Sequence, residues 1–246
     1  MLSGVVFFSS DRLALAAVEA WRTIEGLRMV EYFDEGSLRL LRTRYSDIPS
    51  ASVAALLIEQ EVQTAHDTDD WLDRLETAAA LVEESWFGSS AADRERFRRF
   101  RHALPEVVND TVRRRGLMKM STDFAVPLVH SSEMMDYYRD RLNSSFSGKY
   151  VIFGHIGDAH VHVNILPEST LDSDDARTLI DEMAVKAVSL GGTVAAEHGL
   201  GKRKTHLLAV QYAPEQIASM WAVKRRLDPN EILGPGTLLP ASNSTE

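Results

Sequence analysis

The first third of the chain alternates between continuous apolar runs and apolar residues at helical spacing. Residues 5–8 (VVFF) are typical of a short strand, and residues 12–25 follow with the spacing of an amphipathic helix and with Asp11 as its expected N-cap. By the same criteria, residues 27–32 and 52–62 are predicted to be strands, and residues 35–44 and 70–84 are predicted to be helices. The first 65 residues therefore have a β-α-β order.

The rest of the chain continues this alternation. Residues 89–104 predict a helix that Pro105 interrupts and residues 106–115 resume. After it we expect a strand over 121–127, a helix over 132–142, two strands within 150–166, a helix over 172–190, an extended segment over 193–197 and a helix over 214–226, before an irregular tail over 234–240. The segment from Thr122 to Glu197 thus has a β-α-β order as well.

Strands separated by helices, with strand pairs among them, predict an α+β fold. The expected architecture is an antiparallel-rich sheet with helices on one face, built from ferredoxin-like units. Because the β-α-β order occurs twice, the pattern indicates a duplicated arrangement, although no residue-level repeat accompanies it.

Composition narrows the class of protein. With 246 residues, 44% of them hydrophobic, the chain can bury a substantial core. A formal charge of -9 argues against a nucleic-acid partner, and the basic run at residues 94–101 is interpreted as the solvated side of an amphipathic helix. The absence of cysteine excludes disulfides and thiolate metal sites and fits a reducing compartment.

The chain shows no signal for the membrane or for secretion. No apolar run approaches the roughly 20 residues that a membrane-spanning helix needs, and the first residues lack a basic region typical of a signal peptide. We therefore predict a cytoplasmic protein without a transmembrane segment.

The densest chemistry lies between Gly154 and Ile165. His155, His160 and His162 lie there with Asp158 and Asn164, and from residue 161 onward the sequence alternates so that His160, His162 and Asn164 share the polar face of a strand. The turn at Gly157-Asp158 allows His155 to meet His162 on the next strand. From these residues alone, a metal site and a solvent-facing strand are equally good interpretations.

A second cluster follows the extended segment 193–197. Glu197 and His198 stand beside each other where this segment enters the glycine loop Gly199-Leu200-Gly201. A phosphate-binding loop is excluded, because Ala196 and Arg203 replace the required Gly and Ser/Thr. Glu197-His198 is either a surface pair or a contributor to a site; with His155 and His162 it completes a three-ligand set that leaves positions for water or substrate.

Several ordered motifs together resemble the C-terminal substrate domain of FAD-linked oxidases, in the vanillyl-alcohol oxidase superfamily, the group of D-lactate dehydrogenase, the glycolate oxidase flavin subunit and D-2-hydroxyglutarate dehydrogenase. The resemblance covers nearly the whole chain and is most specific from residue 95 onward. It is carried by residues 122–127 (TDFAVP), residues 154–158 (GHIGD) with His162 and Asn164, residues 196–201 (AEHGLG) with Lys204, and residues 220–236.

This resemblance implies roles for particular residues. His155, His162 and Glu197 would bind a divalent metal, with zinc expected, and His198 would be the catalytic acid/base beside the flavin. Asn164 would contact substrate, and Arg101 falls near an arginine that contacts substrate carboxylate in some members. Residues 1–240 would form the substrate-binding domain, with 241–246 as a disordered tail.

The resemblance also implies partners. The cofactor would be FAD, bound mainly by an FAD-binding domain or subunit that normally precedes this region and is absent from this sequence, so we expect an excised domain or one half of a split enzyme that is inactive alone. The substrate would be a small anionic D-2-hydroxy acid. A homodimer and a peripheral membrane location through an electron-transfer partner are compatible with this assignment. The alternatives are a stand-alone metal-binding module without a redox role and a metal-dependent hydrolase.

Two departures from the family pattern stand out. Ala159-His160 occupy positions where many members have Gly-Asn, and Gly234 and Thr237 replace Asn and Lys of the common tail motif, where flavin-side contacts are then in question. For His160, the choices are an extra ligand, a substrate contact and a solvent-facing side chain, of which we favour the last.

Overall fold

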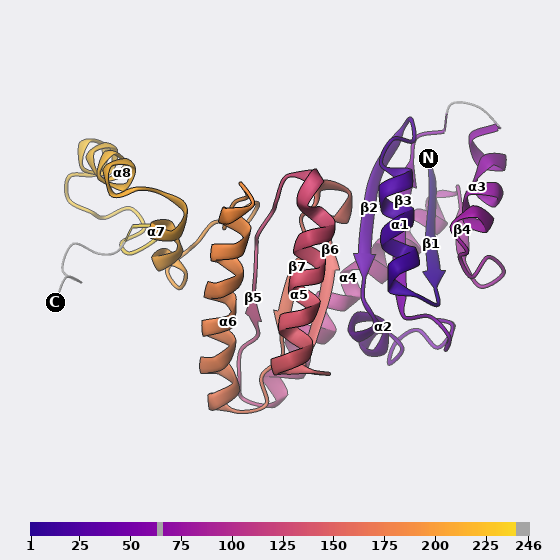
Figure 1. The fold of residues 1–246 in the computed structure, drawn as a ribbon, viewed down its shortest axis with the longest axis horizontal. Helices are drawn as coiled ribbons and strands as arrows, with labels where there is room; N and C mark the ends of the chain where they lie inside the picture. Colours follow the sequence, from indigo (N-terminus) through magenta and orange to yellow (C-terminus); the bar gives the residue numbers. More distant parts are fainter. Residues whose placement is uncertain (63–65, 240–246) are drawn as a thin grey trace.

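The computed structural model describes residues 1–62 and 66–239, with no side-chain description for residues 66–69. Within the described residues, the strands form one seven-stranded antiparallel sheet in the order β4-β1-β3-β2-β6-β7-β5 (Figure 1). The strands are β1 (Leu2–Phe8), β2 (Leu27–Phe33), β3 (Ala54–Gln60), β4 (Trp86–Gly88), β5 (Met120–Ser121), β6 (Tyr150–Gly154) and β7 (His162–Ile165).

The α-helices of the described residues are α1 (Asp11–Trp21), α2 (Glu35–Leu41), α3 (His66–Thr77), α4 (Ala91–Arg114), α5 (Ser131–Phe146), α6 (Thr170–Ser189), α7 (Leu208–Gln211) and α8 (Pro214–Leu227). Short 3-10 turns occur at η1 (Leu128–His130), η2 (Ile156–Asp158) and η3 (Thr205–Leu207). In this part of the chain, no helix combines the length and the hydropathy that a membrane crossing requires. The tail predicted for residues 241–246 lies outside the described residues.

The sheet consists of two ferredoxin-like units. The first runs β1-α1-β2-β3-α3-β4 and has the strand order β4-β1-β3-β2. The second runs β5-α5-β6-β7-α6, and Thr193 pairs with Ala125 beside β5 in the place of a fourth strand. The units join where β2 pairs with β6, at Tyr32 opposite Gly154 and Phe33 opposite Phe153. The α+β fold with an antiparallel sheet is thus confirmed, and the repeat is present in topology rather than in sequence.

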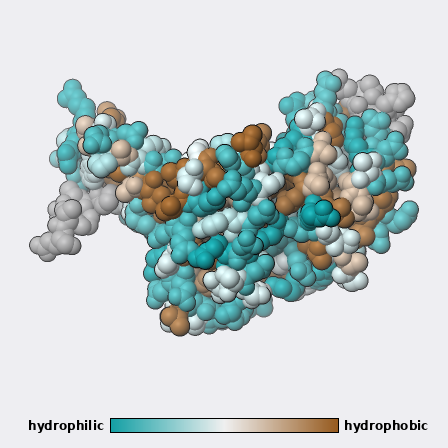
Figure 2. All heavy atoms as spheres, viewed as in Figure 1, coloured by the Kyte–Doolittle hydropathy of each residue, from teal (hydrophilic) through white to brown (hydrophobic). Residues whose placement is uncertain are grey.

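Helices cover both faces of the sheet, which corrects one part of the prediction. The four helices that belong to the two units, α1, α3, α5 and α6, pack on one face, as expected. The additional helices α2 and α4 pack on the other face through residues such as Leu38, Leu41, Phe97 and Phe100. The reason is that β1 and β3 are apolar on both sides, so each side must be removed from water. The outward side of α5 and α6 is predominantly hydrophilic (Figure 2).

Pro105 does not interrupt the helix, which was predicted to break there. Helix α4 runs continuously from Ala91 to Arg114, and Ser90 and Asp93 form a capping box at its start. A proline inside a helix leaves the carbonyl of the residue four positions earlier, here Arg101, without its helical donor. Burial of Phe97, Phe100, Leu104 and Val108 against the sheet, all below 2% exposed, offsets this loss.

The sheet leaves one polar surface open. On β6 and β7, one face carries Ile152, Val163 and Ile165 into the core beneath α5 and α6. The opposite face carries Phe153, His162 and Asn164, which line a cavity beside the middle of α4. The strand alternation predicted for residues 160–165 is therefore correct, and its polar side faces a cavity rather than open solvent.

Candidate metal and substrate site

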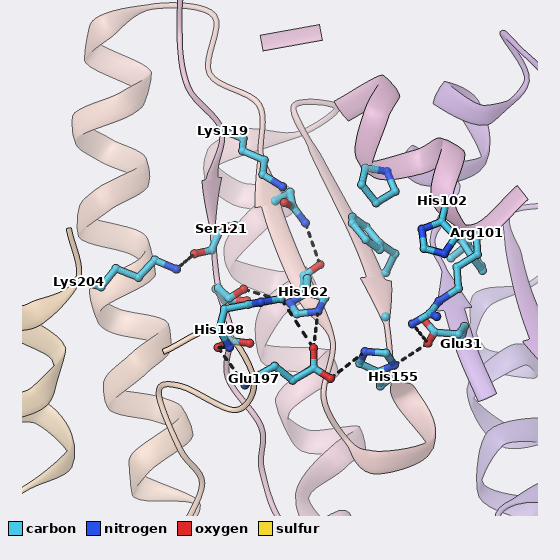
Figure 3. Close-up of a pocket in the computed structure, with 17 residues that line it drawn as sticks. Glu31, Arg101, His102, Lys119, Ser121, His155, His162, Glu197, His198 and Lys204 are labelled. Carbon is cyan, nitrogen blue, oxygen red and sulfur yellow. Dashed lines mark hydrogen bonds and ion pairs between the residues drawn. The ribbon is translucent and has the colours of Figure 1, made fainter. Parts of the chain in front are cut away.

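The open face of the second unit contains a cavity of about 450 Å³ (Figure 3). Strands β2, β6 and β7 form its floor, α4 forms one wall, and the segments around residues 119–123 and 197–204 complete it. All the site residues predicted from sequence line this cavity: Arg101, His155, His162, Asn164, Glu197 and His198. The structure therefore brings the two motifs predicted from sequence into one place.

His155 follows directly after β6 and is held between two carboxylates. Its Nδ1 lies 2.5 Å from Oε1 of Glu31 on β2, and its Nε2 lies 3.1 Å from Oε1 of Glu197. The hydrogen bond to Glu31 is the main cause that raises the pKa of His155, against the opposing effect of burial. Gly154 permits this path because its φ is +130°, and a Cβ there would meet the His162 ring at 3.0 Å.

His162 on β7 has a similar arrangement. Its Nδ1 lies 3.3 Å from the carbonyl oxygen of Thr122, and its Nε2 lies 4.0 Å from Oε2 of Glu197. Burial lowers the pKa of His162, so the neutral imidazole that a metal requires is favoured. Metal-binding histidines usually bond an oxygen through the ring nitrogen that is not bound to the metal, and both His155 and His162 meet that condition.

Asp123 anchors the loop that carries Glu197. Its Oδ2 accepts hydrogen bonds from the backbone N–H groups of Glu197 and His198, at 3.2 and 2.8 Å. Burial alone would raise the pKa of Asp123, but bonds from His160 and from these two N–H groups outweigh it and hold the pKa at about 2. Asp123 is thus an ionised, buried support for the loop.

The sequence interpretation did not single out Asp123 or Glu31. Residues 121–127 were predicted as a strand and residues 122–127 were part of the family motif, without a role for Asp123, and Glu31 was included in the strand over 27–32. The available signal was the acid within the apolar stretch Met29-Val30-Glu31-Tyr32-Phe33, because a carboxylate 2% exposed needs a charged or hydrogen-bonding partner.

His160 does not face solvent, which corrects our expectation. It is 5% exposed, and its Nε2 lies 3.1 Å from Oδ1 of Asp123. The polar side of this strand turns toward Asp123 and Glu197 rather than toward water, so the alternation that suggested exposure instead buries the ring. Its Nδ1 lies 4.0 Å from Oε1 of Glu197.

The donor atoms fit a divalent cation. His155, His160, His162 and Glu197 each offer one ligand atom, and these atoms lie within 4.8 Å of one another. A second overlapping group consists of Asp123, His162, Glu197 and His198. Nitrogen and carboxylate donors of this kind suit Zn²⁺ and the other first-row divalent ions. The ligand set His155, His162 and Glu197 stays a prediction that this geometry accommodates.

The residues expected to act on the substrate differ in exposure and in the contacts they already make. Asn164 is 1% exposed, and its amide donates to the carbonyl of His162 at 3.4 Å. Arg101 lies over the cavity but pairs with Oε1 of Glu31 at 2.8 Å. The His198 side chain is 70% exposed, and its Nε2 lies 3.7 Å from Glu197. Their predicted roles as substrate contacts and acid/base stay predictions.

Two lysines add positive charge to the same cavity. Lys204, noted in the sequence only as part of a motif, donates to the carbonyl of Ser121 at 2.6 Å, and Lys119 lies nearby (Figure 3). Burial, reinforced by Lys204, lowers the pKa of Lys119, and burial also lowers that of Lys204. Both are cations whose charge an anionic ligand would help to stabilise.

Comparison with known proteins assigns the chain to a family. Residues 2–238 match the family described as FAD linked oxidases, C-terminal domain, and the chain belongs to it. The chain is 35% identical to the D-lactate dehydrogenase [cytochrome], mitochondrial, of Arabidopsis thaliana over 51% of this chain and 22% of that protein. It is 27% identical to glycolate oxidase subunit GlcD of Bacillus subtilis (strain 168) over 85% of this chain and 44% of that protein.

Other relatives agree with this family. The chain is 31% identical to the mitochondrial D-2-hydroxyglutarate dehydrogenase of Bos taurus over 66% of this chain and 28% of that protein. A solved structure of alkyldihydroxyacetonephosphate synthase has the same fold, with a TM-score of 0.54 at 14% identity, over 95% of this chain and 44% of that one. The chain therefore spans less than half the length of each of these relatives. The family predicted from the sequence motifs is confirmed.

Proposed function

We propose that this chain is the substrate- and metal-binding domain of an FAD-dependent enzyme that oxidises a D-2-hydroxy acid to the 2-oxo acid. The candidate substrates are of the lactate, glycolate and 2-hydroxyglutarate type, after the names of the relatives. The observation that carries the proposal is the convergence of His155, His162 and Glu197 in one cavity. Asn164 and the cationic side chains share that cavity.

His155, His162 and Glu197 would hold the metal, for which zinc is the expected ion. Glu31 and the Thr122 carbonyl orient the two imidazoles so that each presents Nε2 toward Glu197. When bound, a divalent cation would polarise the hydroxyl of a 2-hydroxy acid and lower its pKa. The backbone anchor at Asp123 keeps the Glu197 carboxylate within reach of both rings.

His198 is the proposed base. It stands next to the proposed ligand Glu197, its backbone is fixed by Asp123, and its side chain is 70% exposed, against 23% for His155 and 14% for His162. In the oxidation, His198 would accept the proton of the substrate hydroxyl, and FAD, held by its binding partner, would supply the acceptor for the hydride from C2. The 2-hydroxy acid thereby loses two electrons and becomes the 2-oxo acid.

The positively charged side chains in the cavity suit an anionic substrate. Lys119, Lys204 and Arg101 surround the polar floor formed by His162 and Asn164. Arg101 is already paired with Glu31, so the lysines are the better candidates for a substrate carboxylate in this arrangement. Asn164 can supply hydrogen bonds from the floor of the cavity.

The proposed partner is an FAD-binding domain or subunit. It would cover the open face of the second unit, because His198 and the cavity must meet the flavin there. Cytoplasmic location, a peripheral membrane association through an electron-transfer partner, and a homodimer stay as predictions. A stand-alone binding module and a metal-dependent hydrolase using the same ligands remain the alternatives that an experiment must separate.

The test is flavin reduction without oxygen. The protein, reconstituted with FAD and its flavin-binding partner, is mixed with D- and L-lactate, glycolate, and D- and L-2-hydroxyglutarate, and bleaching of the flavin absorbance is followed. We expect bleaching with at least one of these acids, and with the D rather than the L form where two exist. A flavin that stays oxidised with every member of the panel, although dithionite reduces it, would contradict the proposal.

A further inference from the structure

We propose that His160 is a fourth protein ligand, so that the chain binds its metal through three imidazoles and one carboxylate. This inference rests on the proposed metal site of His155, His162 and Glu197 and extends it by one residue.

The first argument is the arrangement of the rings. The His160 ring centre lies 4.7 Å from that of His162 and 5.5 Å from that of His155. All three rings surround the Glu197 carboxylate, at 3.1 Å for His155 and 4.0 Å for His160 and His162. Ligands of one cation at about 2.0–2.2 Å lie at most about 4.4 Å apart. Donor atoms within 4.8 Å therefore need only small side-chain movements to share an ion.

The second argument is the oxygen atom that each imidazole ring contacts through its other nitrogen. His155 bonds Glu31, His162 bonds the Thr122 carbonyl, and His160 bonds Asp123, in each case through the nitrogen that points away from Glu197. A proton on Nε2 of His160 serves the bond to ionised Asp123, which leaves the lone pair on Nδ1 facing Glu197. His160 therefore has the same support that orients the two predicted ligands.

The third argument is what lies between His160 and Glu197. The lone pair on Nδ1 of His160 and the carboxylate oxygen Oε1 of Glu197 are both hydrogen-bond acceptors, and they face each other at 4.0 Å. The His160 residue is only 5% exposed. The Glu197 side chain is 44% exposed, but the Nδ1 acceptor of the buried His160 ring is unfavourable there unless a cation or a proton lies beside it. A shared divalent ion satisfies His160, His162 and Glu197 together.

A fourth ligand changes which ions suit the site. On a four-coordinate ion such as tetrahedral Zn²⁺, four protein ligands leave no place for substrate. On a six-coordinate ion they leave two places, which is the number that the carboxylate and hydroxyl oxygens of a 2-hydroxy acid require. The three-imidazole set thus favours ions that accept six ligands, such as Mn²⁺ or Co²⁺, over tetrahedral Zn²⁺.

The experiment uses Co²⁺ as the probe, because its visible spectrum reports ligand number. The protein is freed of metal with a chelator and titrated with Co²⁺ as wild type, as His160→Gln and as His206→Gln. Gln keeps an N–H donor for Asp123 and lacks the Nδ1 ligand. His206 pairs with Asp181 at 2.8 Å on the surface, so His206→Gln is a matched control outside the site.

We expect His160→Gln to weaken Co²⁺ binding at least about 10-fold and to alter the visible spectrum, and His206→Gln to change neither. X-ray absorption of the wild-type Co²⁺ protein should show three imidazoles. If His160→Gln fails to fold, the wild-type measurement decides alone, and two imidazoles overturn the inference. An unchanged spectrum and affinity in folded His160→Gln also overturn it. If His160→Gln binds Co²⁺ like the wild type but His162→Ala does not bind it, the proposed site of three ligands stands without His160. If the wild type binds no Co²⁺, the proposed metal site itself is wrong.

Discussion

The carboxylate of Glu31 lies 2.5 Å from Nδ1 of His155 and joins the two halves of the molecule at the candidate site. Glu31 belongs to β2 of the first ferredoxin-like unit, and His155 follows β6 of the second, across the only strand pair that links the units within the described residues. The same oxygen forms an ion pair with Arg101 on α4, at 2.8 Å. A residue of the first unit therefore orients a proposed ligand of the second.

Glu31→Gln should weaken metal binding while leaving the fold intact. Gln has the same size but carries no charge, so it orients the His155 ring less strongly and makes Nε2 a poorer ligand. We expect an affinity for Co²⁺ or Zn²⁺ that is about 10–100-fold lower, measured by competition with a chromophoric chelator. Glu59→Gln on the adjacent strand β3 is the control, since Glu59 points to the same face but lines a different cavity. Equal affinities in the two variants would contradict the orienting role.

Gly154→Ala should impair both stability and metal binding. Gly154 has φ +130°, where an L side chain is strained, and the new Cβ would lie 3.0 Å from Cδ2 of His162. We expect a loss of about 1–3 kcal/mol in the free energy of unfolding, measured in urea, together with weaker Co²⁺ binding. Gly116→Ala is the control, because Gly116 also has positive φ but has open space around its Cβ position. It should lose some stability without any change in metal affinity.

The sequence was sufficient for most of the fold, for identifiable reasons. Apolar periodicity located nearly all the strands and helices, because burial sets that periodicity directly. The short strand β4, Trp86–Gly88, was missed, since three residues carry too little pattern. Pro105 was taken as a helix break because local propensity argues so, whereas packing of α4 on the sheet overrides it.

The site was predictable as motifs but not as a geometry. His155, His162 and Glu197 were grouped as a ligand set from their residue types, and the resemblance implied their roles, while no local rule indicates that Glu31 and Asp123 support them from distant segments. His160 illustrates the limit most clearly. The alternation of polar and apolar residues gave the correct face of the strand. Whether that face meets solvent or Asp123 depends on a segment 37 positions away in the sequence.

Asp34→Asn should stabilise the protein at neutral pH and not in acid. Asp34 caps α2 through a bond from the Ser37 N–H at 2.8 Å, and burial raises its pKa to about 6. A carboxyl group whose pKa is higher in the folded state than in the unfolded state stabilises the fold at pH values below its unfolded pKa, which is near 4. This contribution to stability is lost as the pH rises through the folded pKa of about 6. Asn retains the capping oxygen without the charge.

For Asp34→Asn we therefore expect a gain of up to about 3 kcal/mol in unfolding free energy at pH 7.5 that largely disappears near pH 4. Urea denaturation of wild type and variant across this range measures it. Asp93→Asn provides a control of opposite sign, because its bonds to Ser90 lower the pKa of Asp93. A gain for Asp34→Asn that is the same at both pH values would show that charge burial is not its cause.

His198→Asn should slow flavin reduction without weakening metal binding. The ring is exposed and its Nε2 lies 3.7 Å from Glu197, so its removal disturbs little of the buried network, and the backbone N–H that bonds Asp123 remains. If His198 accepts the hydroxyl proton, the rate of anaerobic flavin bleaching by the accepted acid should fall by about 10²–10⁴-fold, with the Co²⁺ affinity unchanged. His206→Asn on the surface is the control and should reduce flavin at the wild-type rate. If His198→Asn reduces flavin at the same rate as the control, another group in the cavity accepts the proton. If His198→Asn loses metal affinity together with activity, His198 helps to hold the metal site and the loss of rate does not report proton transfer.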